Sequence, residues 1–236
     1  MGRPFLTAER IPFKFNETIL NMTSQIFSKV EFIEFTLKAN VLRFGDFTTK
    51  AGRQSPYFFN AGLFTDGVAI AKLGQFYAQA ILNANIEFDM LYGPAYKGIT
   101  LSASTAIALA GFNRNVPFAF NRKEVKDHGE GGLIIGAPIS GKILIIDDVI
   151  SAGTSINESF TLINSFDAEI VGIVVSIDRK EKGSGKLSAI EEIFEKYKVP
   201  VKSIIDIDNI IDFLKKDIGN KKILDQMLGY KQNYGV

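Results

Sequence analysis

The sequence contains no cysteine, so a disulfide framework and a thiolate metal site are both excluded. This absence is compatible with a reducing compartment. The chain has one histidine, His128, which confines the commonest general acid–base side chain to one segment. With 236 residues, of which 46% are hydrophobic, the chain is long enough to bury a sizeable core without such cross-links.

Long apolar runs and an excess of one charge are also absent. No stretch reaches the ~18 to 20 apolar residues of a membrane span, and residues 1–24 lack the apolar run of a signal peptide. The formal net charge of +1 gives no general affinity for nucleic acid or acidic membranes. We therefore expect a cytoplasmic protein that binds neither, with a weakly structured leader at 1–24 and one domain at 25–236.

Apolar strand-like runs alternate with helix-like segments along the chain, a pattern typical of an α/β fold with a mainly parallel sheet. The clearest strand is 142–146, whose continuous apolar side chains indicate burial on both faces. A helix is predicted after it at 155–166, and the tail after Gly219 is ambiguous. Ligands bind such sheets at the carboxyl ends of strands, so the loops there are the first candidates for a site.

The segment after strand 142–146 combines an acidic pair, Asp147 and Asp148, with small hydroxyl-bearing residues at 151–155. Backbone N–H groups in such a loop can converge on a phosphate, and the dipole of the following helix favours the same anion. Aspartates accept hydrogen bonds from sugar hydroxyls. The alternative is a strand end followed by a simple helix cap. The ordered combination favours a sugar-phosphate site, and neither a GxGxxG nor a Walker loop is present.

Residues 143–155 resemble the phosphoribosyl-diphosphate (PRPP) motif of type I phosphoribosyltransferases. From about residue 32 to 236 the chain resembles the orotate phosphoribosyltransferase family, with further matches at 44–48, 52–62, 93–98 and 120–132. The resemblance implies a mainly parallel central sheet flanked by helices, a small N-terminal hood subdomain and a flexible lid loop. It implies transfer of the phosphoribosyl group from PRPP to N1 of orotate, giving orotidine 5′-monophosphate and pyrophosphate in de novo pyrimidine (UMP) biosynthesis.

The resemblance also assigns residues to PRPP. Asp147 and Asp148 would bind the ribose hydroxyls, and 151–155 would bind the 5-phosphate. The family usually has threonine at the position of Ser151, so the hydroxyl is retained here. The whole set assigned to PRPP is Lys50, Tyr96, Lys97, Arg122, Lys123, Lys126, His128, Asp147, Asp148, Val149, Ile150, Ser151, Ala152, Gly153, Thr154 and Ser155.

The segment from Ala95 to Gly98 resembles the family's pyrophosphate loop. Gly93 and Gly98 permit close approach of the backbone, and Lys97 supplies positive charge. Taken alone, Lys97 is typical of a solvated surface lysine; its place between a strand and a helix makes it a candidate. The resemblance implies that the Ala95–Tyr96 peptide is strained or cis, which costs ~3–4 kcal/mol and tends to occur at functional sites.

Arg122, Lys123, Lys126 and His128 form a basic cluster that ends in the glycine-rich segment 129–132. The alternative is a mobile charged surface loop. Four cationic side chains suit a departing pyrophosphate, and the glycines suit a hinged lid. In the resembling family this loop closes over the neighbouring subunit's site in a homodimer. The implied catalytic residues are therefore Lys126 and His128, acting in trans, together with Lys50.

The resemblance assigns orotate to Phe58, Phe59, Ser151 and Arg179. A flat base needs an apolar platform, and a planar guanidinium can bind a carboxylate through two parallel hydrogen bonds. The alternative for the two phenylalanines is core packing, for one ring or both. Mg²⁺ is the expected cofactor, carried mainly by PRPP, because it prefers phosphate oxygens and water over a protein cage. We therefore assign no protein metal ligands.

Two rival functions use the same fold. One is a phosphoribosyltransferase for a purine or another base, against which 55–60 and Arg179 argue. The other is a non-catalytic PRPP-sensing regulator, which usually binds nucleic acid, whereas this chain has no basic stripe. We set aside a bifunctional UMP synthase, because too few residues follow the transferase match for a decarboxylase barrel.

Overall fold

The computed structural model describes residues 27–236 except 50–51, 127–131, 151–152, 184 and 217–219, and the side chains of Val125 and Lys126 are also not described. The helices and strands, in chain order, are α1 (Lys29–Lys38), β1 (Leu42–Thr48), β2 (Gln54–Phe59), η2 (Ala61–Leu63), α2 (Gly67–Ala84), β3 (Met90–Gly93), α3 (Lys97–Gly111), β4 (Phe118–Lys126), β5 (Gly132–Gly136), β6 (Gly141–Val149), α4 (Thr154–Ile163), β7 (Ala168–Asp178), α5 (Ala189–Tyr197), β8 (Val201–Asp206), α6 (Ile207–Lys215) and α7 (Lys221–Tyr234).

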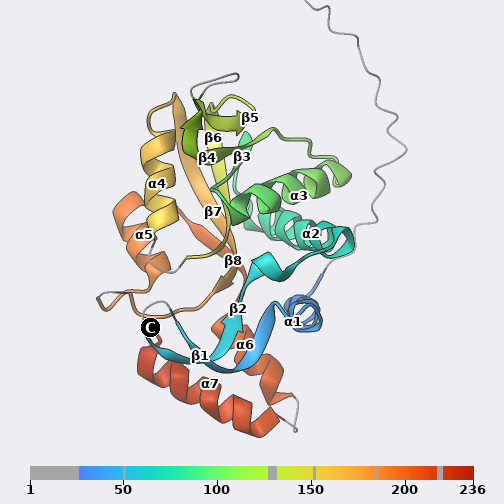
Figure 1. Ribbon diagram of the computed structural model, residues 1–236, viewed down its shortest axis with the longest axis vertical. Helices are drawn as coiled ribbons and strands as arrows, with labels where there is room; N and C mark the ends of the chain where they lie inside the picture. The colour runs from blue at the N-terminus through green and yellow to red at the C-terminus, as the bar shows by residue number, and fades with distance from the viewer. Residues whose placement is uncertain (1–26, 50–51, 127–131, 151–152, 184, 217–219) are drawn as a thin grey trace, which may run out of the picture.

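A six-stranded sheet in the order β5-β4-β3-β6-β7-β8 forms the centre of the molecule. All its pairs are parallel except β4–β5, which is antiparallel. Helices α2 and α3 cover one face, and α4 and α5 cover the other (Figure 1). This arrangement confirms the predicted α/β class with a mainly parallel sheet.

Strand β6 shows why the sheet is covered on both sides. Leu144 and Ile146 pack into the cluster that includes α2 and α3, whereas Ile143 and Ile145 pack into the cluster beneath α4 and α5. All four side chains are fully buried. Because successive side chains alternate between faces, the continuous apolar run predicted at 142–146 becomes a central strand.

The strands β1 and β2 form a separate antiparallel pair with an irregularity between Phe44 and Phe47. Together with α1, α6 and α7 they lie beyond the carboxyl ends of the central strands (Figure 1). Helix α1 begins at a capping box, in which Ser28 accepts from the Glu31 backbone and Glu31 accepts from the Ser28 backbone. The position of this small subdomain fits the expected hood over the sheet edge.

Three segments differ from the sequence prediction. Strand β6 continues to Val149, so Asp147 and Asp148 are among the last residues of the strand rather than following it. The polar segment 122–132 contributes to a hairpin, because β4 continues to Lys126 and β5 starts at Gly132. The ambiguous tail forms the 14-residue helix α7. Within the described residues, no helix has the length and apolarity needed to cross a membrane.

Candidate active site

The ends of β3 and β6 lie side by side, since Tyr92 pairs with Ile145 in parallel register. The turn after β3 leads into α3, whose first residue is Lys97. Its Nζ atom lies 2.6 Å from Oδ2 of Asp148. The Asp148 side chain is 9% exposed and the Lys97 side chain 47%, so the lysine closes the solvent side of a buried carboxylate. Two segments predicted to bind PRPP are thus joined directly.

Asp147 is buried just behind this ion pair, with 7% of its surface exposed. Its Oδ1 accepts from the Asp148 backbone N–H at 2.8 Å, and its Oδ2 accepts from the Ser155 hydroxyl at 3.0 Å. Burial, and next the negative charge of Asp148, raise the pKa of Asp147 to about 6, although these hydrogen bonds oppose the rise. A buried aspartate with a pKa raised in this way is typical of a functional site.

The turn between β6 and α4 is built for close approach. Gly153 has φ +66 and stands at the N-cap of α4, where no side chain of the described residues accepts a hydrogen bond from the first helical N–H groups. Uncapped N–H groups and the helix dipole together favour an anion at this position. Ser151 and Ala152, which the sequence also assigned to the phosphate, lie outside the described residues.

Asn157 holds this turn from behind. Its Nδ2 donates to the Gly153 carbonyl at 2.9 Å. Its Oδ1 accepts from Lys196 Nζ at 2.7 Å and from the Tyr197 hydroxyl at 2.5 Å, both on α5. The turn between β6 and α4 is therefore connected to helix α5 through the amide side chain of Asn157. The sequence analysis did not identify this residue.

The loop after β3 has the compactness expected of its glycines. A Cβ added to Gly93 would lie 1.9 Å from the Gly98 carbonyl oxygen, and one added to Gly98 would lie 2.6 Å from the Gly93 carbonyl carbon. The Ala95–Tyr96 peptide is cis, one of the two forms that the resemblance implied. Asn121 Oδ1 accepts from the Ala95 N–H at 2.8 Å, and Tyr96 is 72% exposed.

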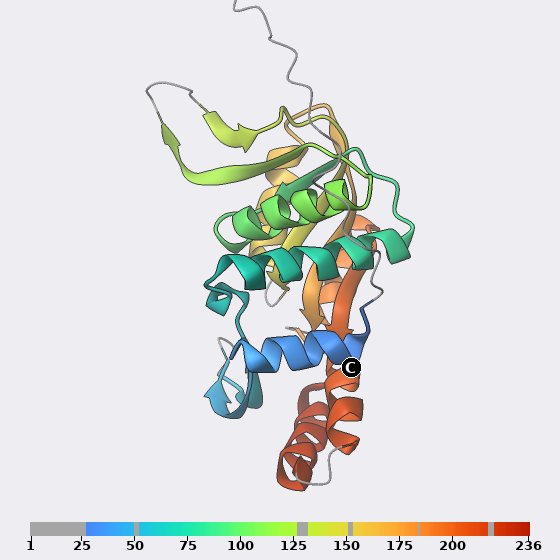
Figure 2. The same ribbon diagram turned by 90° about the vertical axis from the view of Figure 1, so that its right-hand side faces the viewer.

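The β4–β5 hairpin projects beyond the body of the sheet (Figure 2). Lys123 forms an exposed ion pair with Glu158 at 3.5 Å, and Arg122 donates from Nη1 to the Gly132 carbonyl at 3.4 Å. Lys126 pairs with Gly132 through the backbone. The Lys126 side chain, His128 and Lys50 are outside the described residues, so their predicted catalytic roles stay predictions.

Arg179 follows β7 and joins the sheet to the hood. Its Nη2 donates to Ser55 Oγ at 3.1 Å, and its guanidinium lies 4.2 Å from the centre of the Tyr57 ring. Phe59 belongs to the core and is 7% exposed, whereas Phe58 packs against Phe47 at 5.3 Å between ring centres. Because side chains alternate along a strand, the Phe58 ring projects from the face of β2 opposite to Ser55 and Tyr57.

Two further groups support the site and were not recognised in the sequence: the buried Tyr77 and the partly buried Glu181. The Tyr77 hydroxyl, on α2, lies 2.7 Å from the Asp147 carbonyl oxygen and 2.7 Å from Ser176 Oγ. An apolar-looking helix gives no periodic signal that one tyrosine carries such a contact. Glu181, two residues after Arg179, accepts from Arg179 Nε at 2.7 Å. A charged residue after a strand resembles any surface loop residue.

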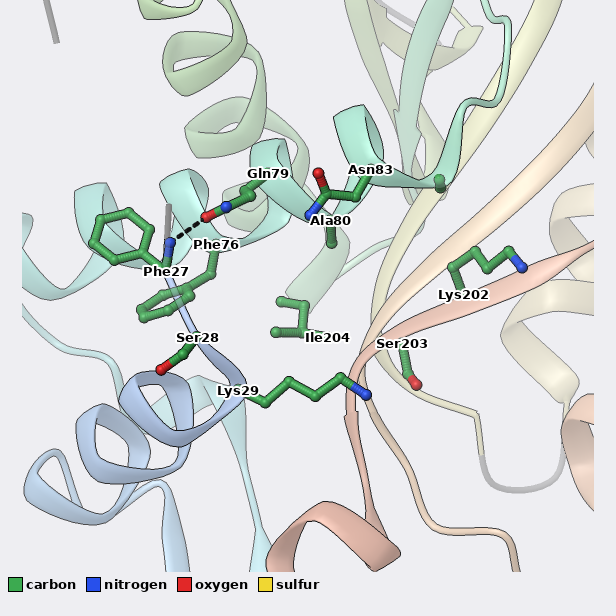
Figure 3. Close-up of a pocket in the computed structure, with 11 residues that line it drawn as sticks. Phe27, Ser28, Lys29, Phe76, Gln79, Ala80, Asn83, Lys202, Ser203 and Ile204 are labelled. Carbon is green, nitrogen blue, oxygen red and sulfur yellow. Dashed lines mark hydrogen bonds between the residues drawn. The ribbon is translucent and has the colours of Figure 1, made fainter. Parts of the chain in front are cut away.

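A cavity of about 310 Å³ lies elsewhere, between the start of α1, the second half of α2 and β8 (Figure 3). Lys29 and Lys202 stand at its rim, but in this view the Lys202 side chain extends away from Lys29. None of its lining residues belongs to the predicted site. No three acidic or histidine side chains of the described ranges come together as a metal site.

Comparison with known proteins agrees with this geometry. The family model described as "Phosphoribosyl transferase domain" matches residues 63–205. The orotate phosphoribosyltransferase of Thiobacillus denitrificans is 55% identical over 208 residues, covering 88% of this chain and 98% of that protein. The enzyme of the same name from Pseudomonas aeruginosa is 51% identical over 207 residues, covering 87% and 97%.

Solved structures give the same relationship. The crystal structure of orotate phosphoribosyltransferase from Francisella tularensis superposes with a TM-score of 0.79 at 42% identity, covering 87% of this chain and 99% of that one. The central sheet and its flanking helices are therefore those of a type I phosphoribosyltransferase. With relatives this similar along nearly their whole length, the chain belongs to the orotate phosphoribosyltransferase family.

Proposed function

We propose that this protein transfers the 5-phosphoribosyl group of PRPP to N1 of orotate, with orotidine 5′-monophosphate and pyrophosphate as products. The observation that carries the proposal is the contact between Lys97 and Asp148, which unites the loop after β3 with the end of β6. One supplies positive charge for a pyrophosphate and the other hydrogen-bond acceptors for a ribose. The identity to the Thiobacillus denitrificans relative supports the choice of acceptor.

The reaction exchanges one bond at C1 of the ribose for another. The bond from C1 to the pyrophosphate oxygen breaks, the electron pair leaves with pyrophosphate, and orotate N1 forms the new bond to C1 as its proton is released to the departing pyrophosphate. Asp147 and Asp148 hold the ribose hydroxyls, and the N-terminus of α4 with Gly153 holds the 5-phosphate. Lys97 stabilises the charge that develops on the leaving group, where a fixed cation stabilises the transition state more than the bound substrate.

The acceptor lies on the other side of C1, towards the hood. We assign Arg179 to the orotate carboxylate, because it is the cation that connects β7 with β2. Ser151, Phe58 and Phe59 remain predicted orotate contacts. Of the two rings, Phe58 is the more exposed and Phe59 belongs to the core.

A homodimer completes the proposed site, with Lys126 and His128 of the β4–β5 hairpin acting on the partner's substrates. The projecting hairpin supports this arrangement (Figure 2). Mixing two inactive variants tests it. When the Lys126→Ala and Asp147→Asn proteins are mixed in equal amounts, about a quarter of the wild-type activity should return after subunit exchange. Half of the dimers then contain one subunit of each kind, and each of these dimers holds one intact site. Absence of any recovery after verified exchange would place the lysine in its own subunit's site.

Mg²⁺ is the proposed cofactor, bound mainly by PRPP, where it neutralises phosphate charge. Mg²⁺ prefers few protein carboxylates together with waters and phosphate oxygens, and the diphosphate of PRPP offers such oxygens. This supports a metal that arrives with the substrate rather than one held by the protein. A dependence of activity on Mg²⁺ in proportion to the Mg²⁺–PRPP complex would agree with that view.

One assay tests the function directly. Orotate consumption should require PRPP, with release of one pyrophosphate for each orotate consumed. Hypoxanthine, adenine and uracil serve as matched acceptors under the same conditions. Turnover of a purine but not of orotate would refute the proposal. The Arg179→Lys variant should raise KM for orotate, because a lysine ammonium cannot reproduce the planar donor pattern of a guanidinium.

A further inference from the structure

Arg179 is already fixed in the free protein by three hydrogen-bond acceptors. Its Nε donates to Glu181 Oε1 at 2.7 Å, and its Nη2 donates to Ser55 Oγ at 3.1 Å and to the Tyr230 hydroxyl at 3.4 Å. Within the described part of the chain, no residue accepts a hydrogen bond from Nη1. One edge of the guanidinium is thus hydrogen-bonded to protein, and the Arg179 side chain as a whole is 14% exposed.

Tyr230 connects this arginine to the C-terminal helix α7. Its hydroxyl donates to Glu181 Oε1 at 2.8 Å, the same oxygen that accepts from Arg179 Nε. Its ring meets Tyr57 edge to face, with 6.1 Å between ring centres, and Tyr57 lies under the guanidinium. The Tyr230 side chain therefore contacts both the arginine and its carboxylate partner, and only 5% of Tyr230 is exposed.

The loop that carries Arg179 is held by the same end of the chain. Glu181 pairs with Gly235 in an antiparallel bridge. The Lys182 N–H donates to the Tyr234 carbonyl at 2.8 Å, and the Val236 N–H donates to the Lys180 carbonyl at 3.0 Å. An isolated β-bridge and two backbone hydrogen bonds thus hold the last residues against the loop that carries Arg179.

We propose that Tyr230 is a positioning residue for the acceptor, which holds the guanidinium of Arg179, through Glu181, in the orientation that binds the orotate carboxylate. This inference rests on the function proposed above. Ordering a long arginine before the ligand arrives removes an entropic cost from binding. Sharing Glu181 Oε1 with the tyrosine also weakens the competition of that carboxylate with the one on orotate.

The Tyr230→Phe variant tests the proposal, because it removes the hydroxyl and keeps the ring that packs on Tyr57. We expect KM for orotate to rise ~10-fold, the effect of losing a hydrogen bond to charged groups. KM for PRPP should change by less than about twofold, because the donor site lies at the ends of β3 and β6. The Tyr234→Phe variant is the matched control, since none of the described residues hydrogen-bonds to the Tyr234 hydroxyl.

A double-mutant cycle separates positioning from a general structural role. If Tyr230 acts through Arg179, adding Tyr230→Phe to Arg179→Lys should raise KM for orotate no further. Additive effects, an unchanged KM for orotate in Tyr230→Phe, or equal rises in both KM values with a lower Tm would overturn the proposal. A wild-type protein that does not consume orotate would instead refute the function, so the two failures are distinguishable.

Discussion

Lys97 Nζ lies 2.6 Å from Asp148 Oδ2, so two residues that we assign to one substrate satisfy each other in the free protein. A buried carboxylate without a partner is costly, and Asp148 is 6% exposed. When PRPP binds, its ribose hydroxyls can replace the lysine at Asp148. The lysine then becomes available to the pyrophosphate, and binding and charge placement are coupled.

Lys97→Met should lower kcat/KM for PRPP ~100-fold, the effect of removing one preorganised group from developing negative charge. KM for orotate should change much less. Steady-state kinetics with each substrate varied in turn measures both. Lys142→Met is the control, because the Lys142 side chain forms a solvent-exposed ion pair with Glu87 at 3.5 Å, away from the site. A similar loss in the control would show that net charge, rather than position, is responsible.

The raised pKa of Asp147 predicts how stability depends on pH. The native state holds a proton up to about pH 6, whereas an unperturbed aspartate loses it near 3.8. The native state therefore binds more protons across that window, and the contribution of Asp147 to stability falls as pH rises from about 4 to 6. Asp147→Asn should remove this dependence and stabilise the ligand-free protein by on the order of 2–3 kcal/mol at pH 7.

Thermal unfolding of both proteins between pH 4 and pH 8 measures the difference. The melting temperatures of the two proteins should converge near pH 4, separate as the pH rises from about 4 to 6, and stay apart by a constant amount above pH 6, with the asparagine variant the more stable. A constant offset at every pH would contradict the assignment of the raised pKa to Asp147. Activity should change in the opposite sense, because the variant loses a charged acceptor for the ribose hydroxyls.

Two buried tyrosines provide a matched pair for stability. The Tyr77 hydroxyl bridges the Asp147 carbonyl and Ser176 Oγ, whereas the Tyr57 hydroxyl is buried without a hydrogen-bond partner among the described residues. Tyr77→Phe should lower the free energy of unfolding by about 1–3 kcal/mol, since it leaves buried polar groups unpaired. Tyr57→Phe should be neutral or stabilising.

Urea titration of both variants measures these free energies, and the kinetics of each add a second criterion. Because Tyr77 contacts the end of β6, its variant should also raise KM for PRPP. Equal destabilisation by the two substitutions would mean that ring packing dominates and that the hydroxyl contacts contribute little.

Asn157→Ala should raise KM for PRPP ~3- to 10-fold, because the phosphate turn at Gly153 loses its link to α5, a hydrogen bond of ordinary strength. Turnover at saturating PRPP should be nearly unchanged, since the reacting atoms lie elsewhere. Asn164→Ala is the control, as Asn164 stands at the opposite end of α4. Titration with inorganic phosphate or PRPP in a binding assay should rank the variants in the same order. An unchanged affinity in Asn157→Ala would remove the amide from the site.

The sequence predicted the central strand, its acidic pair and the loop before α4 because these features are local. Apolar runs, glycines and hydroxyls leave a pattern within a dozen residues. The extension of β6 to Val149 was missed, since polar aspartates at a strand end look like the start of a loop. The continuation of β4 through residues 122–126 and the short edge strand β5 were also missed, because the charged end of β4 lacks the apolar alternation that signals a sheet.

Contacts between distant segments could not be predicted in the same way. Tyr77 and Ser176 are 99 residues apart, and Arg179 and Ser55 are 124 apart. Their pairing depends on how the helices and the hood pack on the sheet, which no local spacing encodes. The role of Tyr230 could not be predicted either, because the tail that contains it gave no clear secondary-structure signal.

The candidate site is divided between the ends of different strands, and this division affects how such enzymes can acquire new acceptor bases. The donor half comes from the ends of β3 and β6, and the acceptor half comes from the end of β7, the hood and α7. Apart from the predicted contacts of Ser151 with both substrates and of Lys50 with PRPP, these halves come from different loops. Substitutions that change the preferred base can therefore accumulate in the acceptor half, while the donor half, which binds the sugar phosphate, stays unchanged. A library confined to β2, the 179–183 loop and α7 is accordingly the economical place to seek new acceptors.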